Sequence, residues 1–172
     1  DEARYADKVK DKDVAKFFGM IANIDDNVGR LLDKLVEWSI DRDTLVIFIN
    51  DNGGTAGTRV FNAGMRAQKG SPWLGGIRAS SFWRWPGTLK PADCDRLAAH
   101  IDFFPTLTEL AGVKLTAEVK QQVEGRSLVS LLSNPKAEWS DRTLFTHVGR
   151  WPVGADRSKF KYATCSVRNS QF

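Results

Sequence analysis

The chain has 172 residues, of which 42% are hydrophobic and 27% are charged, so it can form the core of about one domain. Charges of both signs are mixed along the sequence, which excludes a disordered polyelectrolyte. The net charge of +4 comes without a block of like charges, which favours a solvated surface over a nucleic-acid groove. We therefore expect no nucleic-acid partner. No run of about 18 apolar residues is present, so we expect no membrane span.

The first part of the chain predicts a surface lead-in, a long amphipathic helix and a strand. Residues 1–12 are charged and lack an apolar period, whereas from Asp13, the expected N-cap, apolar side chains recur every three or four residues. That stripe consists of Phe17, Met20, Ile21, Ile24, Val28, Leu31, Leu32, Leu35 and Val36. The short β-branched run at residues 44–49 is typical of a strand covered on both faces in a largely parallel sheet. Helix, short loop and buried strand together predict an α/β layered domain.

Shorter elements follow. The glycine-dotted stretch at residues 50–78 is too irregular for a helix, and long loops of this kind tend to be functional. Beyond it the sequence predicts strands at residues 79–85 and 96–99, a helix from Asp102 to Gly112, a helix at residues 127–132, and strands at residues 142–147 and 161–168.

The pair Asp51-Asn52 stands at the end of the first predicted strand. In open α/β sheets, ligands bind beyond the carboxyl ends of the strands, and the oxygens of Asp and Asn suit Ca²⁺ or Mg²⁺. The sequence Asp-Asn-Gly-Gly is equally typical of a turn, and spacing alone favours the turn. A cation also needs more oxygen ligands than these two residues supply.

Three other residues are candidates for contact with an anion. Lys69 lies between flexible segments and can deliver a compact cation to an oxyanion, although surface lysines are far commoner. His147 stands close to Arg150 and an aromatic residue, which forms a weak anion-binding cluster. The other histidine, His100, precedes a helix in an apolar context that favours a structural role.

Several motifs in one order resemble the second half of the catalytic domain of type I sulfatases, in the alkaline phosphatase superfamily. The helix at residues 19–32 and the strand LVIFINDNG at residues 45–53 are similar to the metal strand of these enzymes and the helix before it. Lys69-Gly70, followed by Gly-Gly-Ile-Arg at residues 75–78, resembles the family segment K-G-x-x-x-E-G-G-x-R. Trp-Pro-Gly at residues 85–87 and the D-x-x-P-T motif from Asp102 match two further stretches.

The resemblance implies a part of an alkaline-phosphatase-like sandwich, with a mostly parallel sheet and flanking helices. Residues 1–138 would be the second half of the catalytic domain, and residues 139–172 the start of a smaller C-terminal subdomain. By the same resemblance, Asp51 and Asn52 are ligands of one Ca²⁺, and Lys69 contacts the sulfate. His147 and Arg150 would bind the substrate, a carbohydrate or aryl sulfate ester. The family nucleophile is a formylglycine made from Cys or Ser, and a periplasmic or secreted location is implied.

The chain departs from the family pattern in what it lacks. Neither Cys94 nor Cys165 has the C/S-x-P/A-x-R pattern, and no paired aspartates at an N-terminal strand end are present. Leu74 replaces the usual glutamate, and Ala79-Ser80 replaces a common Val-Pro. We therefore expect a truncated piece of a longer sulfuric ester hydrolase, inactive by itself. A phosphodiesterase or phosphonate hydrolase of the same superfamily, and an inactive sulfatase-like binding domain, are the alternatives.

Overall fold

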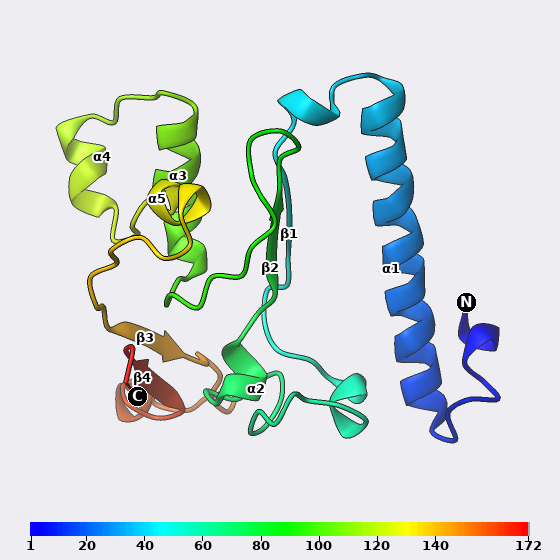
Figure 1. The fold of residues 1–172 in the computed structure, drawn as a ribbon. Helices are drawn as coiled ribbons and strands as arrows, with labels where there is room; N and C mark the ends of the chain where they lie inside the picture. Colours follow the sequence, from blue (N-terminus) through cyan, green and yellow to red (C-terminus); the bar gives the residue numbers. More distant parts are fainter. Residues whose placement is uncertain (172) are drawn as a thin grey trace. The chain divides into compact units, whose positions relative to one another are not determined.

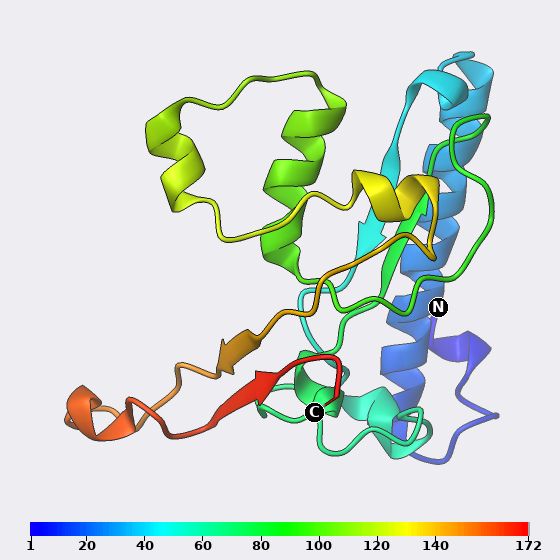
Figure 2. The same ribbon diagram turned by 60° about the vertical axis from the view of Figure 1, so that its left-hand side comes forward.

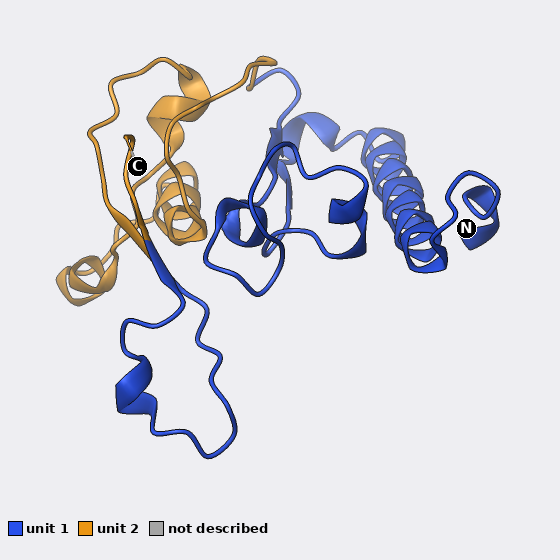
Figure 3. Ribbon diagram, turned by 90° about the horizontal axis from the view of Figure 1, so that it is seen from below, with its two compact units in different colours: residues 1–88, 146–166 blue, residues 89–145, 167–172 orange. Residues whose placement is uncertain are grey.

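The structure is a computed structural model that describes residues 1–171 and divides into two compact units (Figure 3). Unit 1 contains residues 1–88 and 146–166, and unit 2 contains residues 89–145 together with those from 167 on. No helix among the described residues is both long and apolar enough to cross a membrane. Cys94 and Cys165 are exposed free thiols.

The long helix α1 spans Lys12–Glu37 in unit 1 (Figure 1). Its N-cap is Asp11 and not the predicted Asp13, because Asp11 Oδ1 accepts from the backbone N–H groups of Asp13 (2.9 Å) and Val14 (3.4 Å). Asp13 is the second residue of the helix, where its negative charge interacts favourably with the positive end of the helix dipole. Arg59 donates to Asp11 Oδ2 at 2.8 Å, and this hydrogen bond lowers the pKa of the Asp11 carboxyl.

Most of the predicted apolar stripe of α1 is exposed, contrary to what its period implied. The buried residues of the helix are Val14, Ala15, Gly19 and Leu35, whereas Met20 and Leu31 are each 51% exposed. Among the described elements, α1 contacts mainly the short 3-10 turns η1 (Glu2–Arg4), η2 (Asp41–Asp43) and η3 (Ala56–Arg59). Of the four buried residues only Leu35 belongs to the predicted stripe, so the period identified an apolar face that is mostly exposed among the described residues.

Strands β1 (Val46–Ile49) and β2 (Ser81–Arg84) form a two-stranded antiparallel sheet in which Val46 is opposite Arg84 and Ile49 is opposite Ser81. They run side by side in both Figure 1 and Figure 2. The expectation that the first strand is covered on both faces is wrong for this chain, because Phe48 and Ile49 are 38% and 43% exposed. The described strands include no parallel pair for β1, since β2 is its partner in the sheet.

Unit 2 contains the turn η4 (His100–Asp102) and the helices α3 (Phe103–Leu110), α4 (Ala117–Gln122) and α5 (Val129–Ser133). The helix predicted from Asp102 is confirmed as α3, and the chain leaves it through Gly112, whose φ of 66° suits glycine. Residues 96–99, predicted to be a strand, are irregular, and α4 was not predicted. Leu128 and Leu131 supply the buried apolar side chains of this unit.

A buried polar cluster joins three separate segments of unit 2. Asp102 and Arg142 form an ion pair in which Arg142 Nη1 lies 2.7 Å from both carboxylate oxygens. The same carboxylate accepts from the backbone N–H groups of Ala99 and Arg126, each at 2.8 Å. Thr106, fully buried, donates to the Asp102 carbonyl and accepts from the Leu128 N–H. The Asp102 carboxylate and the Thr106 hydroxyl are therefore both paired, as burial requires.

Strands β3 (Leu144–His147) and β4 (Cys165–Arg168) form a second two-stranded sheet. Both lie within the strands predicted at residues 142–147 and 161–168, but they are shorter, and their pairing was not predicted. The connection between them holds the 3-10 turn η5 (Arg157–Phe160). Asp156 caps this turn, because its Oδ1 accepts from the Ser158 N–H (3.1 Å) and from Ser158 Oγ (2.7 Å).

Candidate functional site

Asp51 and Asn52 lie just beyond β1, separated from its end by Asn50, as predicted. The Asn50 N–H donates to the Ser80 carbonyl at 3.2 Å, so pairing with the second strand continues one residue past β1. Asp51 is exposed, and no residue in the described part of the chain donates a hydrogen bond to its carboxylate. Asn52 is half-buried and uses its Nδ2 to bond the Gly53 carbonyl at 2.8 Å, which leaves Oδ1 as its free oxygen.

Three glycines hold this turn against the short helix α2 (Leu74–Ile77) through backbone contacts. We call Gly53, Gly75 and Gly76 the glycine cluster. The Gly53 N–H donates to the Gly76 carbonyl at 2.9 Å, and a Cβ at Gly53 would lie 1.8 Å from the Gly75 oxygen. A Cβ at Gly75 would in its turn lie 2.0 Å from the carbonyl oxygen of Ala67. Only residues without a side chain allow backbones to approach this closely.

Lys69 contacts the same turn through Gly54, which lies fifteen residues earlier in the chain. Its N–H donates to the Gly54 carbonyl at 3.0 Å, so its backbone lies against the turn that carries Asp51 and Asn52. Gly70 follows with a φ of 89°, a conformation that glycine adopts without strain. The side chain of Lys69 is exposed and forms no ion pair with any described residue. The three residues predicted for this site therefore lie on loops whose backbones are in contact.

The oxygens of Asp51 and Asn52 suit a hard cation but do not complete its shell. One free carboxylate and one amide oxygen are ligands that Ca²⁺ prefers, and it takes about six to eight oxygens. No group of three His, Cys, Asp or Glu side chains with metal-binding geometry occurs within residues 1–171. The donor set therefore fits part of a calcium site.

His147 and Arg150 belong to a different cluster. The Gly149 N–H donates to His147 Nδ1 at 2.9 Å, so the ring proton resides on Nε2, which faces the Phe160 carbonyl at 3.2 Å. Both ring nitrogens are therefore occupied by backbone groups. Arg150 is exposed and forms no ion pair in the described part of the chain. No hydrogen bond between described residues joins His147 or Arg150 to Lys69.

A hollow of about 500 Å³ lies beside His147. Its lining residues are His147, Trp151, Arg157, Ser158, Phe160 and Lys161. Sequence reasoning identified His147 but missed Arg157 and Lys161, because cations in a loop follow no period that marks them. The sequence does carry a local excess of Arg and Lys over Asp and Glu there, and this excess could have pointed to them.

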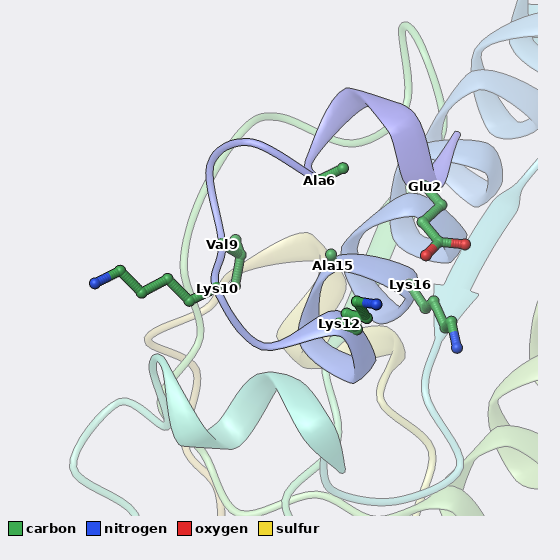
Figure 4. Close-up of a pocket in the computed structure, with 7 residues that line it drawn as sticks. All are labelled: Glu2, Ala6, Val9, Lys10, Lys12, Ala15 and Lys16. Carbon is green, nitrogen blue, oxygen red and sulfur yellow. The ribbon is translucent and has the colours of Figure 1, made fainter.

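The N-terminal segment and the first turns of α1 enclose another hollow, of about 390 Å³ (Figure 4). It is lined by Glu2, Ala6, Val9, Lys10, Lys12, Ala15 and Lys16, and Figure 4 shows the Lys10 side chain extending away from it. None of the residues predicted for the site lines this hollow, so it lies apart from the predicted chemistry.

Residues 1–113 match the family model described as Sulfatase. The chain is 33% identical over 144 residues to a sulfatase of Formosa agariphila, covering 77% of this chain and 26% of the relative. It is also 33% identical over 162 residues to the steryl-sulfatase of Mus musculus, and the match covers 84% of this chain and 25% of that relative. The chain thus spans about a quarter of the length of these curated relatives.

A solved structure, that of Ps i-CgsB in complex with k-i-k-neocarrahexaose, resembles this fold with a TM-score of 0.73 and 27% sequence identity. The similarity covers 84% of this chain and 32% of the other. Fold and sequence therefore agree with the motifs that surround Asp51 and Lys69. This chain belongs to the sulfatase family.

Proposed function

We propose that this chain is part of a sulfuric ester hydrolase and that it supplies one side of the catalytic centre. The observation that carries this proposal is the glycine cluster, which packs backbone on backbone beside the turn of Asp51 and Asn52. Together with the Lys69–Gly54 hydrogen bond, it fixes the backbone that carries Asp51, Asn52 and Lys69. The Asp51 carboxylate and the Lys69 ammonium have no partner among the described residues. Membership of the sulfatase family supports hydrolysis of sulfate esters as the reaction.

Each residue of the loop cluster has a distinct role in this proposal. Asp51 and Asn52 hold one Ca²⁺ together with ligands from outside these 172 residues. When bound, the cation stabilises negative charge on the sulfuryl oxygens. Lys69 places its ammonium against the same group of oxygens, where a positioned charge is most effective because it needs no reorganisation during the reaction. Phosphate diesters carry a similar charge, which keeps a phosphodiesterase as the competing activity.

The remaining catalytic parts are proposed to lie outside this chain. A formylglycine nucleophile does not fit Cys94 or Cys165, since neither has the sequence pattern for that modification. We therefore propose that the 172 residues by themselves do not hydrolyse sulfate esters. In the longer protein, the sheet formed by β1 would extend into a mostly parallel, alkaline-phosphatase-like sandwich, and a periplasmic or secreted location would suit it.

The substrate is proposed to be a carbohydrate or aryl sulfate. The similar structure in complex with neocarrahexaose supports the carbohydrate class, and the steryl-sulfatase relative supports sulfates of ring alcohols. Arg150 is proposed to contact the anionic substrate with its unpaired guanidinium. His147 would contribute through its ring carbons, because both of its nitrogens are bonded to the backbone.

The test is hydrolysis of 4-nitrocatechol sulfate by the longer protein that carries this chain, with bis(p-nitrophenyl) phosphate as the competing substrate. Lys69→Ala is expected to lower kcat about 100-fold or more, the usual effect of removing one charge-stabilising donor. Lys90→Ala, at an exposed lysine outside the site, is the matched control. Asp51→Ala is expected to abolish activation by Ca²⁺. Unchanged turnover in Asp51→Ala, or faster turnover of the phosphate diester, would overturn the proposal.

A further inference from the structure

The connection between β3 and β4 carries an excess of positive charge. Residues 146–166 contain four cations and one carboxylate, a net charge of +3. The cations are Arg150, Arg157, Lys159 and Lys161, and the carboxylate is Asp156. A local excess of one sign attracts ligands of the opposite sign.

The single carboxylate in this stretch does not neutralise its neighbours. Asp156 caps η5 through its bonds to Ser158, and within residues 1–171 no acidic side chain forms an ion pair with Arg157 or Lys161. Two cations thus line one hollow without a counter-ion from the protein. A bound anion would be attracted by both cations.

An aromatic surface lies next to these cations. The Arg157 guanidinium is 5.8 Å from the centre of the Trp151 ring, and the rings of His147 and Trp151 are 6.3 Å apart. His147, which lines the hollow, bonds to both Gly149 and Phe160 and so ties two parts of the connection together. Trp151 is 36% exposed, so part of its surface is accessible to solvent.

We propose that this hollow binds a sulfated sugar unit whose sulfate is not the one being hydrolysed. Arg157 and Lys161 receive the sulfate, and Trp151 receives the apolar face of the sugar ring. The inference rests on the proposed function, because it names a sulfated oligosaccharide, and not a small aryl sulfate, as the substrate class. A single-stranded nucleic acid is also a polyanion with flat rings, and it is the competing ligand that the experiment separates.

The experiment measures binding by this 172-residue chain to a fluorescently labelled sulfated dextran oligosaccharide, with unsulfated dextran of equal length and a thymidine 12-mer as comparisons. The wild type is expected to bind the sulfated sugar in preference to both. The double variant Arg157→Gln/Lys161→Gln is expected to bind it about 100-fold more weakly, since each charge-assisted hydrogen bond contributes about tenfold. Trp151→Ala is expected to weaken it as well.

Lys159→Gln is the matched control, because Lys159 belongs to η5 and carries the same charge but does not line the hollow. It is expected to change binding less than about twofold. Equal losses for Lys159→Gln and for the single variants Arg157→Gln and Lys161→Gln would mean diffuse attraction and overturn the inference. Tighter binding of the thymidine 12-mer, or equal binding of unsulfated dextran, would also overturn it. Circular dichroism of each variant checks that the fold is retained.

These outcomes are separable from those of the proposed function. Hydrolysis of 4-nitrocatechol sulfate by the longer protein tests the centre around Asp51 and Lys69, and a substrate with a single sulfate has no second sulfate for the hollow. Hydrolysis without selective binding of sulfated dextran would contradict the subsite alone. Selective binding without any sulfate ester hydrolysis would contradict the proposed function alone.

Discussion

Asp51 and Asp102 are the same residue type in opposite settings. Asp102 is fully buried, and its carboxylate accepts from two backbone N–H groups and from the Arg142 guanidinium. Asp51 is exposed, and its carboxylate receives no hydrogen bond from any residue in the described part of the chain. The first carboxylate is fully paired inside the protein, whereas the second has no partner among the described residues.

The way in which each aspartate is held differs as well. Around Asp102, side chains and backbone from three segments converge on the carboxylate, so the residue itself supports the fold. Next to Asp51, the glycine cluster fixes the turn by backbone contact alone. A functional carboxylate can stay free only where other groups define the backbone that carries it. Substitutions at the two places should therefore separate stability from chemistry.

The largest effect is expected from Asp102→Ala. This change leaves Arg142 buried without its partner and should lower the free energy of unfolding by about 3–5 kcal/mol. Urea denaturation followed by circular dichroism measures it. The double variant Asp102→Ala/Arg142→Met should recover part of the loss, because it removes the stranded charge. A loss below about 1 kcal/mol would argue against the ion pair.

A smaller loss is expected from Gly53→Ala. The new Cβ would lie 1.8 Å from the Gly75 oxygen, so the backbones of the glycine cluster must separate. We expect a loss of about 1–3 kcal/mol in unfolding free energy, together with a shift of the amide resonances of Lys69 and Gly76. Gly29→Ala is the control, since Gly29 lies in α1 with open space around it, and alanine should stabilise the helix there by up to about 1 kcal/mol. Equal effects of both substitutions would contradict the packing described for the cluster.

The smallest effect on stability is expected from Asp51→Ala, within about 0.5 kcal/mol, because no internal contact of the carboxylate is lost. Thermal unfolding of the variant beside the wild type measures this. Such a result would make any loss of catalysis in the longer protein attributable to the site. A destabilisation comparable to that of Asp102→Ala would end the contrast between the two aspartates.

The sequence predicted those features that depend on local pattern. The apolar period located α1, and the β-branched run located β1. The motif order brought Asp51, Asn52 and Lys69 into one hypothesis, which stays a prediction, and the Lys69 backbone contacts the turn of the other two residues. The N-cap was misplaced by two residues, because Asp11 and Asp13 are equally good caps by type.

Features that depend on distant partners were out of reach. Asp102 and Arg142 are forty residues apart, and nothing near either residue marks the other. The antiparallel partner of β1 could not be inferred from the apolar run alone. A strand covered on both faces and a strand exposed on one face can have the same short run of apolar residues. The period of α1 likewise indicates which face is apolar but not what covers it.

The two-stranded sheet of β1 and β2 has a consequence for handling the protein. Among the described strands, β1 has β2 as its one partner, so no strand lies along the other edge of β1, and the side chains of Phe48, Ile49 and Phe82 are exposed. Edges of this kind pair readily with strands of other molecules. We therefore expect the isolated chain to self-associate as its concentration rises, and charged residues introduced at Phe48 or Phe82 to keep it dispersed.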